Sequence, residues 1–348
     1  MEFTLVSTVF NEAKRINKTI ADLTKQTIQP SEIVITDSGS TDGTYEMLIN
    51  WKNASLVPII ILQKQCCNIA EGRNLAIKAS KYDLIVSTDF GCRFHEDWLK
   101  TLTEPFNNPD VHVSGGAFTV IEKEQNTIAA RAAYVMSNGY NIDINDPSFI
   151  PSSRSIAYKR RVFNQIGGYC EWLTLAADDL IFGKEILARG YRISFVNKPY
   201  VYWGRHSEVN GFIKEAGRYG LGDGEARVNK RNLISNILQL ILRYLFFASL
   251  IYLLLALIFK RSLISVIVCL ICFSPGLKSY YYYTKNWLRY KSSKYNLKVF
   301  LYGFYLLEAT RIRYIIGYFN GIRNASEFQK LQALLLNQRL ERAGNKVS

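Results

Sequence analysis

Acidic residues are scarce in the last third of this 348-residue sequence. Residues 227–348 contain three of them, Glu308, Glu327 and Glu341, beside 19 lysines and arginines. Residues 1–226 are nearly neutral, with 26 acidic and 24 basic side chains. A basic tail is typical of proteins that bind nucleic acid or anionic lipid. The sequence therefore predicts a neutral domain followed by a basic one.

Two other features are missing. No cationic segment with an apolar run and a cleavage site opens the chain, because Phe3–Phe10 leads directly into Asn11 and Glu12. We therefore expect the first domain to stay in the cytoplasm. No Gly-x-Gly-x-x-Gly follows this run, which argues against a dinucleotide oxidoreductase. The hydrophobic fraction of 48% also excludes a disordered chain.

Long apolar runs in the tail favour lipid over nucleic acid. Leu233–Phe259 is long enough for the roughly 20 residues that cross a bilayer. Leu263–Phe273 continues the apolar character, and Tyr280–Tyr283 follow as interfacial aromatics. We predict a transmembrane helical hairpin in residues 227–295, with its basic flanks on the cytoplasmic side. The alternative is a buried helical subdomain, because Arg243 is costly in lipid unless it snorkels or faces protein.

Residues 296–348 are predicted to form amphipathic helices at the membrane interface. Asn296–Gly321 mixes apolar and charged side chains, which favours a helix that lies in the interface. Glu327–Arg342 has the apolar spacing of an amphipathic helix. Either helix could instead pack on the first domain. No nucleic-acid motif accompanies these segments, so the predicted partner is anionic membrane lipid and not nucleic acid.

Short apolar runs alternate with helical patterns in the first domain. The runs are Phe3–Phe10, Glu32–Thr36, Pro58–Leu62 and Asp83–Thr88. Between the first two, apolar residues recur at helical spacing after a predicted cap at Asn11. This alternation predicts an α/β fold with a mostly parallel sheet and flanking helices. Ligands bind such sheets at the carboxyl ends of the strands.

Polar residues and one aromatic residue, Phe10, gather at those predicted strand ends. They are Thr8, Phe10 and Asn11 after the first strand, Asp37 and Ser38 after the second, and Asp89 after the fourth. Each group taken alone is compatible with an ordinary turn or helix cap. Their joint placement at one edge of a sheet predicts a binding site.

Three segments at these positions resemble the family 2 glycosyltransferases, which have the GT-A fold and use nucleotide-sugar donors. VSTVFNE with EIVITDSGSTDGT is similar to the opening signature of that family, and IAEGRNLAIKAS with DLIVSTDFGC to its second half. Residues 151–193 resemble its acceptor-side segment. The resemblance implies a GT-A (Rossmann-like) catalytic domain in residues 1–226, ahead of a C-terminal helical membrane region.

The resemblance also implies which residues bind the donor. These are Thr8, Phe10, Asn11, Asp37, Ser38, Arg73 and Asp89. Phe10 would stack on the base, and Asp37 would accept hydrogen bonds from the base or ribose. Arg73 would lie near the base or diphosphate, or would instead only brace the crevice through Asp37 or Asp89.

A divalent cation, Mg²⁺ or Mn²⁺, is the cofactor that the resemblance implies. Asp89 matches the first acid of the Asp-x-Asp motif that holds the metal in this family. A hard cation with oxygen ligands stabilises a diphosphate leaving group. Gly91 stands where the second acid is usual, so the departure from the motif puts metal dependence in doubt.

Asp179 would be the catalytic base and Asp178 would orient the acceptor, since the pair matches the Glu-Asp motif of the family. A sugar hydroxyl is a poor nucleophile and needs a carboxylate to take its proton. In-line attack would invert the anomeric configuration. The structural alternative is that both acids simply open a helix, where its dipole favours them.

The resemblance to the family 2 glycosyltransferases implies roles for further segments of the first domain. Pro151–Ser155 with Gly167, Gly168 and Tyr169 would form the floor under donor sugar and acceptor. Arg154 and Arg205 would contact phosphates or else lie on the surface. Tyr219–Gly224 resembles a segment that links the catalytic domain to the membrane, and its three glycines otherwise indicate a flexible hinge.

The predicted function is an inverting glycosyltransferase at the cytoplasmic membrane face. It would move a sugar from a UDP-, GDP- or dTDP-linked donor to a lipid-linked or cell-envelope glycan acceptor. No Gln-x-x-Arg-Trp element occurs, which disfavours a processive synthase. The alternative, supported by Gly91, is a catalytically weak nucleotide-sugar-binding scaffold of an envelope glycan assembly complex.

Overall fold

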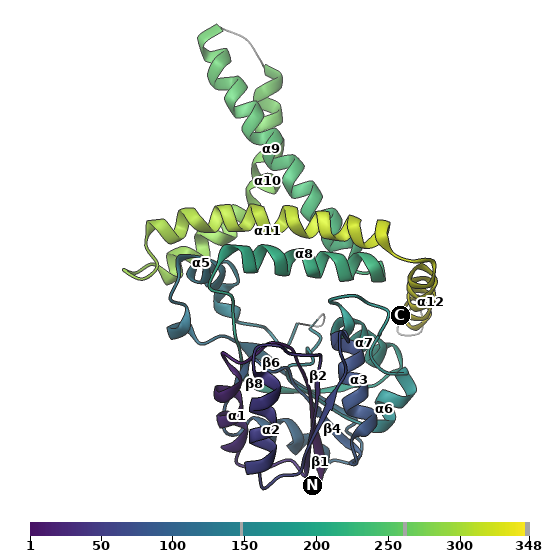
Figure 1. The fold of residues 1–348 in the computed structure, drawn as a ribbon. Coiled ribbons are helices and arrows are strands. Elements are labelled where there is room, and N and C mark those ends of the chain that lie inside the picture. Colours follow the sequence, from purple (N-terminus) through teal and green to yellow (C-terminus); the bar gives the residue numbers. More distant parts are fainter. Residues whose placement is uncertain (147–148, 260–262, 345–348) are drawn as a thin grey trace. The chain divides into compact units, whose positions relative to one another are not determined.

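The computed structural model describes residues 1–146, 149–259 and 263–344 (Figure 1). Contacts divide the chain into two compact units. The first comprises residues 1–122, 140–205 and 325–348, and the second comprises 123–139 and 206–324. This division differs from the predicted boundaries at residues 226 and 295. Residues 209–226 fall in the second unit because they pack along residues 297–324.

The first unit is built on a sheet that has eight strands within the described residues, in the order β3-β2-β1-β4-β7-β6-β8-β5. The strands are β1 (Phe3–Val9), β2 (Glu32–Asp37), β3 (Ile59–Gln63), β4 (Leu84–Ser87), β5 (Cys92–Phe94), β6 (Val113–Thr119), β7 (Ile156–Lys159) and β8 (Ile193–Trp203). The four predicted strands are confirmed as β1–β4 and run parallel. The other half of the sheet is mixed, since β7 is antiparallel to both β4 and β6.

Helices flank this sheet (Figure 1). They are α1 (Ile16–Thr24), α2 (Thr44–Ala54), α3 (Ile69–Ala79), α4 (Trp98–Thr103), α6 (Arg160–Ile166) and α7 (Asp178–Ala188), with short 3-10 turns at Glu104–Asn107 and Glu122–Glu124. Helix α12 (Glu327–Gly344) also belongs to the first unit and packs on α7. The predicted cap at Asn11 is wrong, because α1 begins at Ile16. Asn11 has a φ of 54° and accepts a hydrogen bond from the backbone of Thr41 instead.

Helix α12 confirms the helix predicted over Glu327–Arg342. It packs within the first unit, where Arg339 forms an ion pair with Glu185 at 2.9 Å. Gln329 also donates to the backbone oxygen of Trp172 at 2.8 Å. Helix α12 is therefore packed within the first unit, and its placement at a membrane interface stays a prediction.

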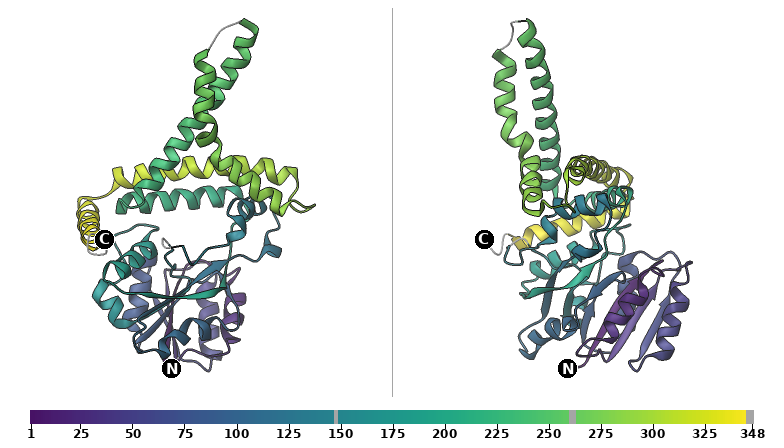
Figure 2. Two further views of the ribbon diagram at one scale, coloured as in Figure 1. Left: turned by 180° about the vertical axis from the view of Figure 1, so that it is seen from behind. Right: turned by 90° about the vertical axis from the view of Figure 1, so that its left-hand side faces the viewer.

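The second unit consists of helices. They are α5 (Ile128–Met136), α8 (Val209–Ala226), α9 (Lys230–Phe259), α10 (Leu263–Tyr290) and α11 (Leu297–Asn324). Helices α8 and α11 lie side by side, as do α9 and α10 (Figure 2). In the described part of the chain, Lys230–Tyr252 is the one stretch long and apolar enough to cross a membrane by length and composition.

Glycines allow α8 and α11 to approach closely. A Cβ atom added at Gly220 would lie 2.1 Å from the backbone oxygen of Tyr314, and one at Gly224 would lie 2.1 Å from that of Tyr318. The segment Tyr219–Gly224 is therefore part of a packed helix, and the interpretation as a flexible hinge is wrong.

Arg243 in α9 faces protein. Its side chain is fully buried, donates to the backbone oxygen of Gly276 at 3.0 Å and forms an ion pair with Glu308 of α11. Its guanidinium group also lies 4.3 Å from the ring centre of Tyr280. These partners remove the cost that an unpaired arginine would carry in an apolar helix.

We expect Gly224→Leu to destabilise the second unit. The new side chain would meet backbone, which cannot move aside, and overpacking of this kind costs about 1–3 kcal/mol. Thermal unfolding of the full chain in detergent, followed by circular dichroism, should show a lower midpoint. Arg218→Leu, at an exposed position of the same helix, is the matched control. Equal midpoints for the two variants would show that α8 and α11 do not need this close contact.

Candidate active site

The loops after β1 and β2 are joined by hydrogen bonds. The backbone nitrogen of Asn11 donates to Ser40 Oγ at 2.9 Å, and that of Ala13 donates to Asp42 Oδ2 at 3.0 Å. Phe10 lies in the first of these loops and is 57% exposed. The two strand ends thus form one edge, with an aromatic ring open to solvent.

Asp37 ends β2 as a fully buried carboxylate. Its Oδ2 accepts hydrogen bonds from the backbone nitrogens of Gly39 and Ser40, both at 3.0 Å. Its Oδ1 is buried and has no hydrogen-bond partner among the described residues. An unsatisfied buried acceptor is costly, so this oxygen suits a donor group of a ligand.

Thr8 and Ser38 lie beside Asp37 and are partly buried. A Cβ atom at Gly72 of α3 would lie 2.8 Å from Thr8 Cγ2, so the first turn of that helix passes very close to β1. Ser38 Oγ lies 3.1 Å from Cys67 Sγ. Thr8 is therefore packed against the first turn of α3, and Ser38 contacts Cys67 just before that helix.

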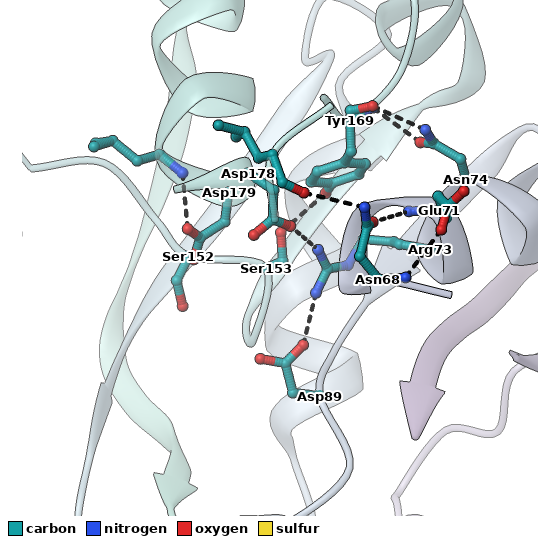
Figure 3. Close-up of polar contacts among 12 residues, drawn as sticks. Asn68, Glu71, Arg73, Asn74, Asp89, Ser152, Ser153, Tyr169, Asp178 and Asp179 are labelled. Atoms are coloured by element: carbon teal, nitrogen blue, oxygen red, sulfur yellow. Dashed lines mark hydrogen bonds and ion pairs between the residues drawn. The ribbon is translucent and has the colours of Figure 1, made fainter. Parts of the chain in front are cut away.

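Arg73 connects three parts of the sequence at the centre of the site (Figure 3). Its side chain extends from α3 and is buried, with Nη2 2.8 Å from Asp89 Oδ1 and Nη1 2.5 Å from Asp178 Oδ2. Its guanidinium carbon lies 4.8 Å from the ring centre of Tyr169. A side chain that is 1% exposed has little surface left for a ligand, so the geometry favours the bracing role through Asp89.

Asp178 and Asp179 open α7, and they differ in accessibility. Asp178 is 8% exposed, and burial raises its pKa to about 6 although Arg73 opposes that shift. Asp179 is partly exposed, and one of its oxygens accepts from the backbone nitrogen of Leu180 at 2.8 Å. The second acid is thus the one that a substrate can reach, while the first holds Arg73.

The segment around Tyr169 is anchored to α3 (Figure 3). Asn74 Nδ2 donates to the backbone oxygen of Tyr169 at 2.9 Å, and the backbone nitrogen of Tyr169 donates to Asn74 Oδ1 at 2.9 Å. Ser153 Oγ donates to the Tyr169 hydroxyl at 3.0 Å. Of the residues predicted as a floor, Ser153 and Tyr169 are therefore in contact, and Tyr169 is held by α3.

A second arginine contacts Asp89 through its other carboxylate oxygen. Arg154 Nε lies 3.6 Å from Asp89 Oδ2, and its guanidinium group lies 4.2 Å from the ring centre of Trp203. Arg205 also lies over Trp203, at 3.7 Å, and donates to the Tyr140 hydroxyl at 2.8 Å. Trp203 could not be predicted as part of the site from the sequence, because one aromatic in a strand gives no sign of what packs on it.

The residues around Asp89 do not by themselves make a divalent cation site. Two guanidinium groups face this carboxylate. A Cβ atom at Gly91 would lie 3.1 Å from both carboxylate oxygens of Glu12, which the sequence analysis did not single out. In the residues that the structure describes, no three histidine, cysteine or acidic side chains are grouped as metal ligands. A cation here would depend on oxygens supplied by a ligand.

We expect Gly91→Asp to destabilise the site rather than restore the missing acid. Gly91 has a φ of 92°, a left-handed conformation that costs about 1–3 kcal/mol for other residues. The added carboxylate would also lie beside Glu12, whose pKa burial already raises. Urea unfolding should show Gly91→Asp less stable than wild type, with Gly91→Ala in between, because alanine carries the strain without the charge. A stable Gly91→Asp variant with gained Mn²⁺ affinity would contradict this.

The fold resembles that of a solved glycosyltransferase. The mannosyltransferase PcManGT from Pyrobaculum calidifontis, in complex with GDP-Man and Mn²⁺, aligns with a TM-score of 0.55 over 93% of this chain and 88% of that chain, at 14% identity. The mixed sheet with flanking helices and this likeness show a GT-A fold, followed by a C-terminal helical region.

Two sequence relatives are O-antigen glycosyltransferases of Salmonella. O-antigen chain rhamnosyltransferase RfbN of Salmonella typhimurium is 26% identical over 217 residues, which cover 60% of this chain and 67% of that protein. O-antigen chain rhamnosyltransferase WbaN of Salmonella anatum is 27% identical over 216 residues, which cover 59% of this chain and 66% of that protein. The matches thus span about two thirds of the length of these relatives.

Two family models match the chain. "Glycosyl transferase family 2" matches residues 4–167, and "Glycosyl transferase family group 2" matches residues 89–283, which is more than half of the chain. The matched ranges include the strand ends of β1, β2 and β4 and the two acids of α7. The chain belongs to the family 2 glycosyltransferases.

Proposed function

We propose that this glycosyltransferase inverts the anomeric configuration as it moves a sugar from a nucleotide-sugar donor to a lipid-linked or cell-envelope glycan acceptor. One observation carries the proposal. The accessible acid Asp179 is next to Asp178, and the buried Arg73 forms ion pairs with both Asp178, at the start of α7, and Asp89, just after β4. A catalytic base must be accessible to the substrate hydroxyl, and neighbouring residues must fix its position.

Asp179 is the proposed base. Its carboxylate takes the proton of the acceptor hydroxyl as that oxygen attacks the anomeric carbon. The new glycosidic bond forms on the face opposite the bond to the nucleoside diphosphate, which leaves with the electron pair. Asp178 and Arg73 fix the first turn of α7 and so fix the base.

The donor nucleotide is proposed to bind at the edge formed by β1 and β2. Phe10 offers an open aromatic face for the base, and the unpartnered Asp37 Oδ1 accepts from a ribose hydroxyl or a base N–H group. Thr8, Asn11 and Ser38 line the same edge. When bound, a divalent cation held by Asp89 would supply charge stabilisation to the diphosphate. Arg154 and Arg205 are further cations for these phosphates.

The names of the relatives suggest which donors to test first. Both Salmonella relatives are O-antigen chain rhamnosyltransferases, so a nucleotide-linked deoxyhexose is the first choice. The apolar stretch Lys230–Tyr252 and the basic tail support attachment to the cytoplasmic face of a membrane, where an acceptor with a lipid anchor would lie.

The test is nucleotide release by the full chain in detergent. UDP-, GDP- and dTDP-sugars are supplied with a membrane lipid extract, with Mg²⁺, Mn²⁺ or EDTA. We expect release from one donor, dependent on the extract and lost in Asp179→Asn. Donor binding without release from any donor would instead support the scaffold. Full activity in EDTA would exclude a required cation.

A further inference from the structure

A small pocket lies among the helices of the second unit. It has a volume of about 230 Å³ and lies between α5, α9, α10 and α11. Its polar lining comes from Gln239, Lys278, Ser279 and Arg311, and its apolar lining includes Met136 and Leu307. None of these residues belongs to the site described above.

Positive charge exceeds negative charge at this pocket. The nearby carboxylate of Glu308 is paired with the buried Arg243. Arg311 donates to Asn236 Oδ1 and to Ser279 Oγ, both at 3.1 Å, and these partners are neutral. In the described parts of the chain neither Arg311 nor Lys278 has a carboxylate partner. Three cations, Arg243, Arg311 and Lys278, thus lie near one carboxylate, that of Glu308, and this net positive charge favours an anionic ligand.

Two further polar groups at the pocket have unused hydrogen-bonding capacity. Ser279 Oγ accepts from Arg243 Nη2 at 2.5 Å and from Arg311 Nη1 at 3.1 Å. Because this oxygen accepts from two guanidinium groups, its own proton is available for a ligand. Gln239 Oε1 is buried without a partner among the described residues, while its Nε2 donates to Ser235 Oγ at 3.2 Å. A phosphate group would satisfy both, because an unprotonated oxygen accepts from Ser279 and a protonated oxygen donates to Gln239 Oε1.

We propose that this pocket binds the phosphate or diphosphate head of a lipid. A guanidinium group, an ammonium group and a hydroxyl are the donors that phosphate oxygens prefer. Met136 and Leu307 offer contact to the first carbons of an apolar chain. The volume is below the roughly 300–1,000 Å³ of sites that enclose whole small molecules, so it suits a head group whose chain stays outside. The identification of this lipid as the acceptor rests on the function proposed above.

The test compares two double variants of the full chain in detergent. Lys278→Gln/Arg311→Gln removes the two cations that line the pocket, and Lys285→Gln/Arg323→Gln removes two exposed cations from the same helices. Binding of a long-chain isoprenyl diphosphate is measured by calorimetry. We expect the dissociation constant to rise about ten- to hundredfold in the first variant, as for the loss of charged hydrogen bonds, and to stay unchanged in the second. Equal affinities in the two variants overturn the proposal.

Thermal midpoints of both variants show whether the fold is intact. If the first variant unfolds, Lys278→Gln alone carries the test, because Lys278 is exposed, and we expect about a tenfold weaker affinity. An unchanged affinity for that single variant would then overturn the proposal.

Further ligands identify the source of the phosphate. Tighter binding of the isoprenyl diphosphate than of phosphatidylglycerol supports an acceptor site, and equal binding of the two supports a site for bulk membrane phospholipid. Equal binding of an alkyl carboxylate overturns a phosphate site. Nucleotide release tests the proposed function separately from this lipid site. If lipid binding depends on the pocket but no donor is turned over, the lipid site is supported and the proposed function is overturned. If the first double variant turns over with a normal KM for the lipid acceptor, the proposed function stands and the proposed lipid site is overturned.

Discussion

Asp179→Asn should lower turnover by about 10²–10⁴-fold, the range that general bases contribute, while donor affinity stays unchanged. The amide keeps the shape of the side chain but cannot take the proton of the acceptor hydroxyl. The measurement is steady-state nucleotide release, with donor binding followed separately by calorimetry. Because Asp179 is partly exposed and has no ion pair in the described chain, the substitution should leave the fold intact.

Asp110→Asn is the matched control, since Asp110 is an exposed acid of the first unit outside the site. It should retain full turnover. If Asp179→Asn turns over at the wild-type rate, another group takes the proton. If it loses donor affinity as well as turnover, Asp179 positions the donor rather than acting as the base.

Arg73→Met should lower the free energy of unfolding by about 3–5 kcal/mol at pH 7, as for a buried ion pair that loses one partner. The variant would leave Asp178 buried and unpaired. The measurement is urea unfolding of the full chain, followed by tryptophan fluorescence. Arg93→Met is the control: its pair with Asp22 is partly exposed, and such pairs contribute about 1 kcal/mol or less.

The loss in Arg73→Met should shrink as the pH falls from 7 to 5. The pKa of Asp178 is already raised to about 6 in the folded protein, from 3.8 as the ordinary value. Removing Arg73 takes away the positive charge that opposes this shift, so the folded pKa rises further. A carboxyl group with a raised pKa in the folded state binds its proton at a higher pH than it does in the unfolded state. The free energy of unfolding of the variant therefore rises as the pH falls towards 5. A pH-independent loss would show that the charge of Asp178 is not the cause.

Local patterns in the sequence predicted much of the first unit. Strands β1–β4 follow from short apolar runs between helical repeats, and these repeats need only neighbouring residues to be recognised. The polar residues at the ends of β1, β2 and β4 could be located for the same reason. The mixed half of the sheet could not, because β5, β6 and β8 pair with partners far away in the chain.

The sequence by itself determined the α/β class, the basic helical tail and the residue types that the site contains. The tertiary structure decided which side chains meet. Arg73 and Asp178 are 105 positions apart, and the glycines of α8 pack against α11, which begins more than 70 residues later in the chain. Periodicity is a property of one short segment, whereas an ion pair or a helix contact depends on how distant segments fold together. The bracing of Asp89 and the excess of positive charge beside Ser279 are therefore properties of the folded chain alone.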